Sequence, residues 1–285
     1  MQSLWLILLV IATACGPIRS SHLSTNSVAT GWEYFRLGEF DLAAHAFAQA
    51  AVVPATEAAG LFGLAQTWHL RRPNPDPDRA AAYYRQIVAL APRSDYAAWS
   101  WLALAWLQAV PPDAAAPAIT TVDSSFQQAA QHFPDHPAGQ EAFLSLQVLQ
   151  LQTNTPASRR VVLAALDGFL QAHPATPYAS AVQTLRAHCF RMLREPANEL
   201  TAVRLAWQLE NDDPLSPKQS PVTTYWRIAT IAEFDLGDFA TAREFYRRLI
   251  AEYPTEQRVF FAKKELQHMA EIEAEIRQEL TRSDS

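Results

Sequence analysis

The side chains with the most reactive chemistry lie in two short stretches. The first, His132-Phe133-Pro134-Asp135-His136, brings together two imidazoles and a carboxylate, which are groups that bind metal ions. One short loop supplies too few ligands without a third element. We therefore predict a helix end and an exposed turn here, with His132 near the negative pole of the helix dipole, and no metal site.

The second stretch is His188-Cys189, which pairs a base with a nucleophile in sequence. Adjacent residues on a helix point about 100° apart, so the two groups are not expected to act on the same atom. Cys189 is predicted to be a small buried side chain.

Longer catalytic patterns are absent from the sequence. It contains no phosphate-binding loop, no dinucleotide-binding glycine pattern and no H-E-x-x-H or C-x-x-C, and its 8 glycines are scattered singly. The net charge of −6, with no Lys/Arg cluster longer than a pair, argues against a nucleic-acid partner. We predict that the protein is not an enzyme and needs no cofactor; a catalytic group assembled from distant segments is the alternative.

The elements that position these side chains are helices, and residues 223–254 show the pattern best. Phe239, Ala242, Tyr246 and Leu249 follow the turn at Gly237 at spacings of three or four, which places them on one helix face. Trp226 precedes this turn and Pro254 ends the second helix. These residues resemble the signature of a tetratricopeptide repeat (TPR).

The same pattern recurs along the chain. Prolines lie about forty residues apart, at Pro54, Pro92, Pro134, Pro174, Pro214 and Pro254. In the first repeat the signature positions are Gly31, Tyr34, Gly38, Phe40, Ala43, Phe47 and Ala50. The intervening repeats diverge: the second has a long turn with Asp78 as an expected N-cap, the fourth breaks at residues 153–156, and the fifth turns at Glu195-Pro196.

The resemblance implies an all-α, right-handed α-solenoid of about six TPR-like hairpins over residues 28–254, followed by a C-terminal capping helix and tail over 255–285. Thirteen helices are expected. The last helix carries an apolar stripe that would close the final repeat: Leu266, Met269, Ile272, Ile276 and Leu280. The alternative is that this helix docks a partner.

The N-terminus predicts export and a lipid anchor. Residues 1–14 read as a signal peptide, because their apolar run is too short to span a bilayer. Cys15 follows small residues as in a bacterial lipobox, and residues 15–27 are expected to be a lipidated cysteine and a flexible tether. Ordinary secretion with a free Cys15 is the alternative.

The tryptophans separate into two predicted groups. Trp99, Trp106 and Trp226 occupy core signature positions. A second set of aromatic and arginine residues is predicted to face a concave groove, where such residues make binding hot spots: Trp32, Phe35, Arg36, Trp68, Arg227 and Phe234. Burial beneath other segments is the alternative for this set.

The lipobox, the proline-punctuated repeats and the closing repeat together resemble envelope TPR lipoproteins, with BamD-like and PilF-like families as the nearest types. This resemblance implies a lipid-anchored scaffold at the outer membrane, facing the periplasm, that binds envelope proteins or peptides in outer-membrane or surface-structure assembly. The alternative function is a glycan-binding envelope lipoprotein that stacks sugar rings on the groove aromatics.

Overall fold

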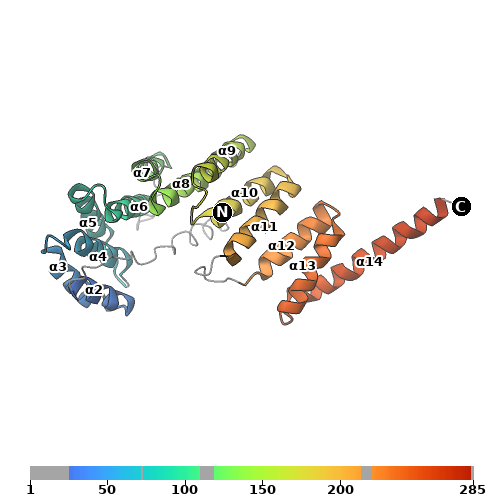
Figure 1. Cartoon of the computed structure of the whole chain (residues 1–285), viewed down its shortest axis with the longest axis horizontal. Helices are drawn as coiled ribbons and strands as arrows, with labels where there is room; N and C mark the ends of the chain where they lie inside the picture. Colours follow the sequence, from blue (N-terminus) through green and yellow to red (C-terminus); the bar gives the residue numbers. More distant parts are fainter. Residues whose placement is uncertain (1–25, 72, 110–118, 213–219, 284–285) are drawn as a thin grey trace. The chain divides into compact units, whose positions relative to one another are not determined.

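The computed structural model describes residues 26–71, 73–109, 119–212 and 220–283. Within these ranges the chain forms thirteen α-helices and no strand, which confirms the all-α class of TPR-like hairpins (Figure 1). No helix in the same ranges combines the length and apolar character needed to span a membrane.

The described residues up to Thr153 form one compact unit. Each of its helices packs on the next along the chain, and α2, α4, α6 and α8 also contact one another in turn, as expected for stacked hairpins. The helices are α2 (Asn26–Arg36), α3 (Phe40–Ala51), α4 (Glu57–Leu70), α5 (Pro77–Leu90), α6 (Asp95–Ala109), α7 (Ile119–His132) and α8 (Pro137–Gln150), followed by the short 3₁₀ segment η2 (Leu151–Thr153).

The described residues from Asn154 onward form a second compact unit. The boundary coincides with the break predicted inside the fourth hairpin, so α8 and α9 lie in different units. The helices of this unit are α9 (Pro156–Ala172), α10 (Ala179–Leu193), α11 (Pro196–Asp212), α12 (Val222–Thr230), α13 (Phe239–Glu252) and α14 (Arg258–Ser283), with the π-helical segment η3 (Ile231–Asp235) after α12.

Local sequence signals explain the turns between helices. Gly38 and Gly237 have φ of 78° and 65°, a region that favours glycine, and each lies in the turn inside a hairpin. The predicted turn before Pro196 is confirmed, since α10 ends at Leu193 and α11 begins at Pro196. The predicted N-cap of α5 was wrong: Asp76, not Asp78, accepts the backbone N–H of Arg79 at 3.0 Å, because Pro77 takes the first helical position.

The core of the first hairpin is centred on Phe47, which is fully buried. Its ring lies so close to Gly31 that a Cβ there would come within 2.6 Å of the ring, and Gly63 of α4 is closer still. The first two hairpins therefore approach each other closely at these glycines. Trp99 and Trp106 pack against cores of the first unit, and Trp226 against the last core of the second, as predicted.

The C-terminal helix caps the second unit only along its first half. Val259, Ala262 and Met269 are buried in the core built by α12, η3 and α13. Farther along, Ile276 and Leu280 are 49% and 59% exposed, and α14 continues past α13 (Figure 1). The first part of the predicted apolar stripe thus packs on the last repeat, whereas the side chains of its second part are exposed to solvent.

Candidate functional site

The predicted groove residues of the first unit are largely engaged in packing. Trp32 lies edge-on to Phe35 and Phe47, with ring centroids 5.4 and 5.0 Å away. Trp68 is partly buried against the core that α4 and α5 share, and the Arg79 guanidinium lies over its ring at 3.9 Å. Arg36, at the end of α2, is exposed. Groove binding by these residues stays a prediction.

The two groove candidates of the second unit differ from each other. Arg227 on α12 is held in an ion pair, because its Nε donates to Oε1 of the buried Glu199 at 2.9 Å. Phe234 in η3 is 61% exposed. Binding by these two residues stays a prediction. Cys15, the predicted lipidation site, lies outside the described residues.

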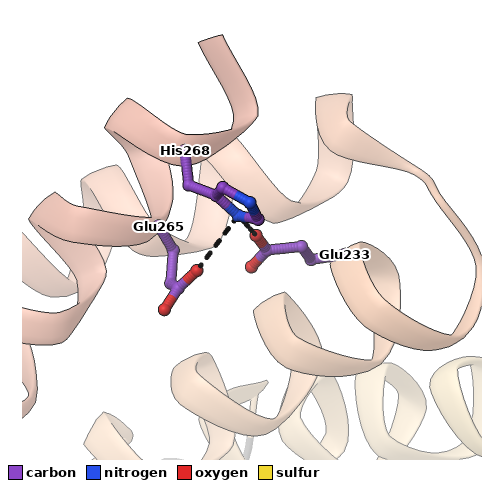
Figure 2. Close-up of side chains that lie close together, drawn as sticks. All are labelled: Glu233, Glu265 and His268. Carbon is purple, nitrogen blue, oxygen red and sulfur yellow. Dashed lines mark ion pairs between the residues drawn. The ribbon is translucent and has the colours of Figure 1, made fainter. Parts of the chain in front are cut away.

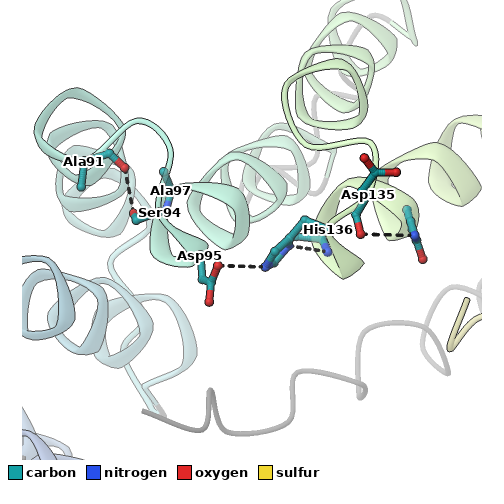
Figure 3. A network of polar contacts seen from close by, with 8 residues as sticks. Ala91, Ser94, Asp95, Ala97, Asp135 and His136 are labelled. Atoms are coloured by element: carbon teal, nitrogen blue, oxygen red, sulfur yellow. Dashed lines mark hydrogen bonds and ion pairs between the residues drawn. The ribbon is translucent and has the colours of Figure 1, made fainter. Parts of the chain in front are cut away.

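The two histidines of the turn at residues 132–136 make different contacts, and Figure 3 shows those of His136. His136 accepts the backbone N–H of Ala138 at 3.1 Å, which caps α8, and its Nε2 lies 3.7 Å from Asp95 at the start of α6. His132 stacks on the Trp101 ring at 5.3 Å. Burial lowers the pKa of His136 although Asp95 acts in the opposite direction. The two imidazoles therefore serve helix capping and ring stacking.

Cys189 is fully buried, as predicted, and its thiol is free. Burial raises the pKa of its thiol to about 11, with a smaller opposing effect from Arg159. A thiol with this pKa is a poor nucleophile at neutral pH.

A cluster that the sequence analysis did not identify lies where the last hairpin meets α14. Glu233 of η3, Glu265 and His268 of α14 point toward one another (Figure 2), and one ligand atom from each lies within 4.8 Å of the other two. His268 Nδ1 is 3.7 Å from Glu265 Oε2 and 4.0 Å from Glu233 Oε1. Glu265 and His268 share a face of α14 because they are three residues apart.

Glu233 reaches this position from a distorted turn of helix. Residues 231–235 are π-helical, and just after this segment the Asp238 N–H donates to the Ala232 carbonyl at 2.7 Å. π-helical turns occur often at functional sites. From this turn Glu233 is directed at the hydroxyl of Tyr246 on α13, which donates to its Oε2 at 2.8 Å.

The electrostatics of the cluster are set by the burial of Glu233. Only 3% of its side chain is exposed, and its Oε1 makes no hydrogen bond among the described residues. Burial raises the pKa of Glu233, and nearby Glu265 adds to the rise, whereas the Tyr246 hydrogen bond and His268 lower it. Burial and the Glu233 hydrogen bond also raise the pKa of Tyr246, so its hydroxyl stays a donor.

The sequence analysis did not find this cluster because its three residues are not close together in the chain. Glu233 is 32 residues from Glu265 (265 − 233), and the packing of α14 on the last hairpin brings them together. One signal was available, namely the Glu-x-x-His spacing of Glu265 and His268, which supplies metal ligands from helices in some bundles.

Comparison with known proteins supports the repeat assignment. The tetratricopeptide repeat family model matches residues 223–255, which include η3, α13 and all of α12 except its first residue. The last hairpin is therefore a TPR. A search of curated proteins found no match.

Solved structures with the same fold cover most of the chain. A structure titled as the functional characterisation of PilF from Pseudomonas aeruginosa is similar with a TM-score of 0.54 and 17% identity, covering 85% of this chain and 96% of that one. PilW, described as a widely conserved type IV pilus biogenesis factor, gives 0.53 and 16%, covering 88% and 100%. The Cut9–Hcn1 structure of the APC/C gives 0.51 and 15%, covering 94% and 46%.

These matches show a tetratricopeptide repeat at residues 223–255 and a fold like that of PilF over most of the chain. At such identities the likeness is one of fold. TPR folds in general present surfaces for protein partners, so the coarse class is a protein-interaction scaffold.

Proposed function

We propose that the protein is a non-catalytic scaffold, tethered to a membrane of the bacterial cell envelope, that binds segments of other proteins during assembly of a surface structure. The observation that carries the proposal is the fold match to PilF over 85% of this chain and 96% of that one. The type IV pilus role printed for PilW favours surface-structure assembly as the process.

The second unit offers the best candidate surface for such a partner. Large apolar side chains are exposed on η3 and α14, with Phe234 at 61% and Phe260 at 59%. Phe260 and Phe261 lie edge-on with ring centroids 5.4 Å apart. Exposed aromatic side chains are the type that anchors protein interfaces. Glycan binding by the groove aromatics has less support, since Trp32 and Trp68 are occupied by packing.

A photo-cross-linking amino acid at Phe234 tests this surface in intact cells. The matched control replaces Thr201, which is exposed on α11 of the same unit. We expect a discrete adduct with an envelope protein from position 234 and none from position 201. Equal adducts from both positions, or none from position 234, would contradict the proposal.

The lipid anchor is tested separately by metabolic labelling with palmitate. We expect the wild-type protein to be labelled and Cys15→Ser to be unlabelled. A deletion strain would then recover its surface structure with the wild-type gene and not with Cys15→Ser. Equal labelling of the two proteins would remove the anchor from the proposal and leave the partner surface to the cross-linking test.

A further inference from the structure

The cluster of Glu233, Glu265 and His268 has the composition of a metal site. Two carboxylates and an imidazole suit borderline first-row cations such as Zn²⁺, whereas Ca²⁺ and Mg²⁺ prefer oxygen ligands alone. Zn²⁺ bonded to nitrogen and oxygen at 2.0–2.2 Å in a tetrahedron places its ligand atoms about 3.4 Å apart. The two distances from His268 Nδ1, 3.7 and 4.0 Å, exceed this spacing by about 0.3 and 0.6 Å, and the three ligand atoms all lie within 4.8 Å of one another, so small side-chain shifts would close the site around an ion.

The unsatisfied oxygen of Glu233 is a second, independent indication. Oε1 is buried and makes no hydrogen bond within the described part of the chain, and His268 Nδ1 faces it at 4.0 Å. A buried carboxylate oxygen without a partner is costly. The other oxygen, Oε2, is fixed by Tyr246, so the carboxylate is oriented by a group behind it, as carboxylates that ligate metals usually are.

The charges around the cluster also favour a cation. Among the described residues, no Lys or Arg forms an ion pair with Glu233 or Glu265, and both carboxylates pair with His268 instead. His268 itself is 54% exposed, which opens the cluster to solvent on one side. An ion can therefore enter from the His268 side, and water can take its fourth position.

We propose that Glu233, Glu265 and His268 bind one Zn²⁺-type divalent cation, which fastens α14 to the last TPR hairpin. Glu233 comes from η3 and the other two ligands from α14, so the ion joins the hairpin to its capping helix. Tyr246 is a positioning residue for Glu233 and does not touch the ion. The proposal is independent of the partner and the membrane anchor.

Zinc binding to the full mature chain, without an affinity tag and after treatment with a chelator, tests the proposal. We expect calorimetry to give one Zn²⁺ per chain, with the affinity reduced at least tenfold in His268→Gln and in Glu265→Gln. Glu275→Gln, an exposed position on the same helix, is the matched control and should bind as the wild type does. At a zinc concentration about one hundred times Kd, the Tm should rise by roughly 5–10 °C in the wild type and in the control only.

Cobalt(II) gives a second readout that does not depend on stability. Intense visible absorption from a four-coordinate cobalt ion is expected in the wild type and Glu275→Gln and should be lost in His268→Gln. Circular dichroism of the metal-free variants checks that they fold. Absence of zinc binding by the wild type, or equal binding by the wild type, His268→Gln and Glu265→Gln, would overturn the proposal.

Discussion

The first and last hairpins follow the same repeat pattern but bury different chemistry. A shift of 199 positions (237 − 38, 246 − 47) aligns Gly38 with Gly237 and Phe47 with Tyr246. Both glycines have positive φ, and both aromatic side chains are fully buried. The two hairpins therefore share both the glycine turn and the large buried aromatic side chain of the repeat signature.

The two hairpins differ at another aligned position, in the first helix of each. The same shift aligns Tyr34, which packs against an apolar core, with Glu233, whose buried carboxylate accepts from the Tyr246 hydroxyl. A TPR can thus exchange an apolar contact for a buried hydrogen bond without losing its hairpin. The carboxylate lies where α14 packs on the last hairpin, and there it can also interact with a polar side chain of α14.

Truncating the shared aromatic position gives the largest expected effect. Phe47→Ala removes a fully buried ring that fills the space between two glycine-bearing helices, and we expect a loss of about 3–5 kcal/mol in the free energy of unfolding of the first unit. Hydrogen exchange of α3 and α4 measures this loss locally. Phe260→Ala is the control: its ring is 59% exposed, and a loss as large as that of Phe47→Ala would contradict the packing account.

Removing the hydroxyl that distinguishes the last hairpin should have an intermediate effect. Tyr246→Phe leaves Oε2 of the buried Glu233 without its donor, so we expect a loss of about 1–3 kcal/mol, measured by denaturant unfolding of the metal-free protein. Tyr253→Phe changes a partly buried tyrosine in the same unit and should change stability by less than about 0.5 kcal/mol. Equal losses of stability in Tyr246→Phe and Tyr253→Phe would mean that the hydrogen bond from the Tyr246 hydroxyl to Glu233 makes no specific contribution.

The shared glycine turns should be equivalent in the two hairpins. An added Cβ at Gly38 or Gly237 meets no atom within 4 Å, so the cost of Ala there comes from the left-handed backbone alone and is about 1 kcal/mol at each. Gly168→Ala, within helix α9 and equally open, should instead stabilise by roughly 0.4–1 kcal/mol. Unequal costs at the two turns would show that η3 strains the second one.

The smallest expected signal is the pH dependence of stability that Glu233 contributes in the last hairpin. Because burial raises the folded-state pKa of Glu233, the folded protein keeps this proton to higher pH than the unfolded chain does. Its contribution to stability is therefore present below the unfolded pKa of about 4.3 and is lost as pH rises through the folded pKa. The stability of the metal-free wild type relative to Glu233→Gln should fall across that window.

Glu195 supplies a control of opposite sign. Hydrogen bonds from Asn198 and Arg160 lower its pKa, so its contribution is present above the unfolded pKa and is lost as pH falls. Wild type relative to Glu195→Gln should therefore gain stability as pH rises. The same direction of change for both pairs would contradict the assignment at Glu233.

The helices and turns could be predicted from the sequence because their signals are local. Apolar spacing, the glycines at 38 and 237 and the proline breaks each act within a few residues, and the structure follows them. The wrong N-cap prediction at Asp78 also has a local cause. Two aspartates flank Pro77, and their spacing alone did not show which of them caps the helix.

The site residues could not be predicted in the same way because they depend on packing between helices. Repeat register predicted an inward face for Trp32 and Trp68 but gave no information on the rings and guanidinium groups that now contact them. The repeat pattern did not distinguish Glu233 from its neighbours. Its importance appears only once α13 and α14 bring Tyr246 and His268 beside it.

A double-mutant cycle at Glu233 and Tyr246 tests the comparison most directly. Glu233→Leu and Tyr246→Phe each leave a polar partner unsatisfied, whereas the two together convert the last hairpin to an apolar pair like that of the first. Unfolding of the metal-free protein should show that the double variant loses at least about 1 kcal/mol less than the sum of the single losses. Strict additivity of the two losses would contradict a coupled, buried pair in the last repeat.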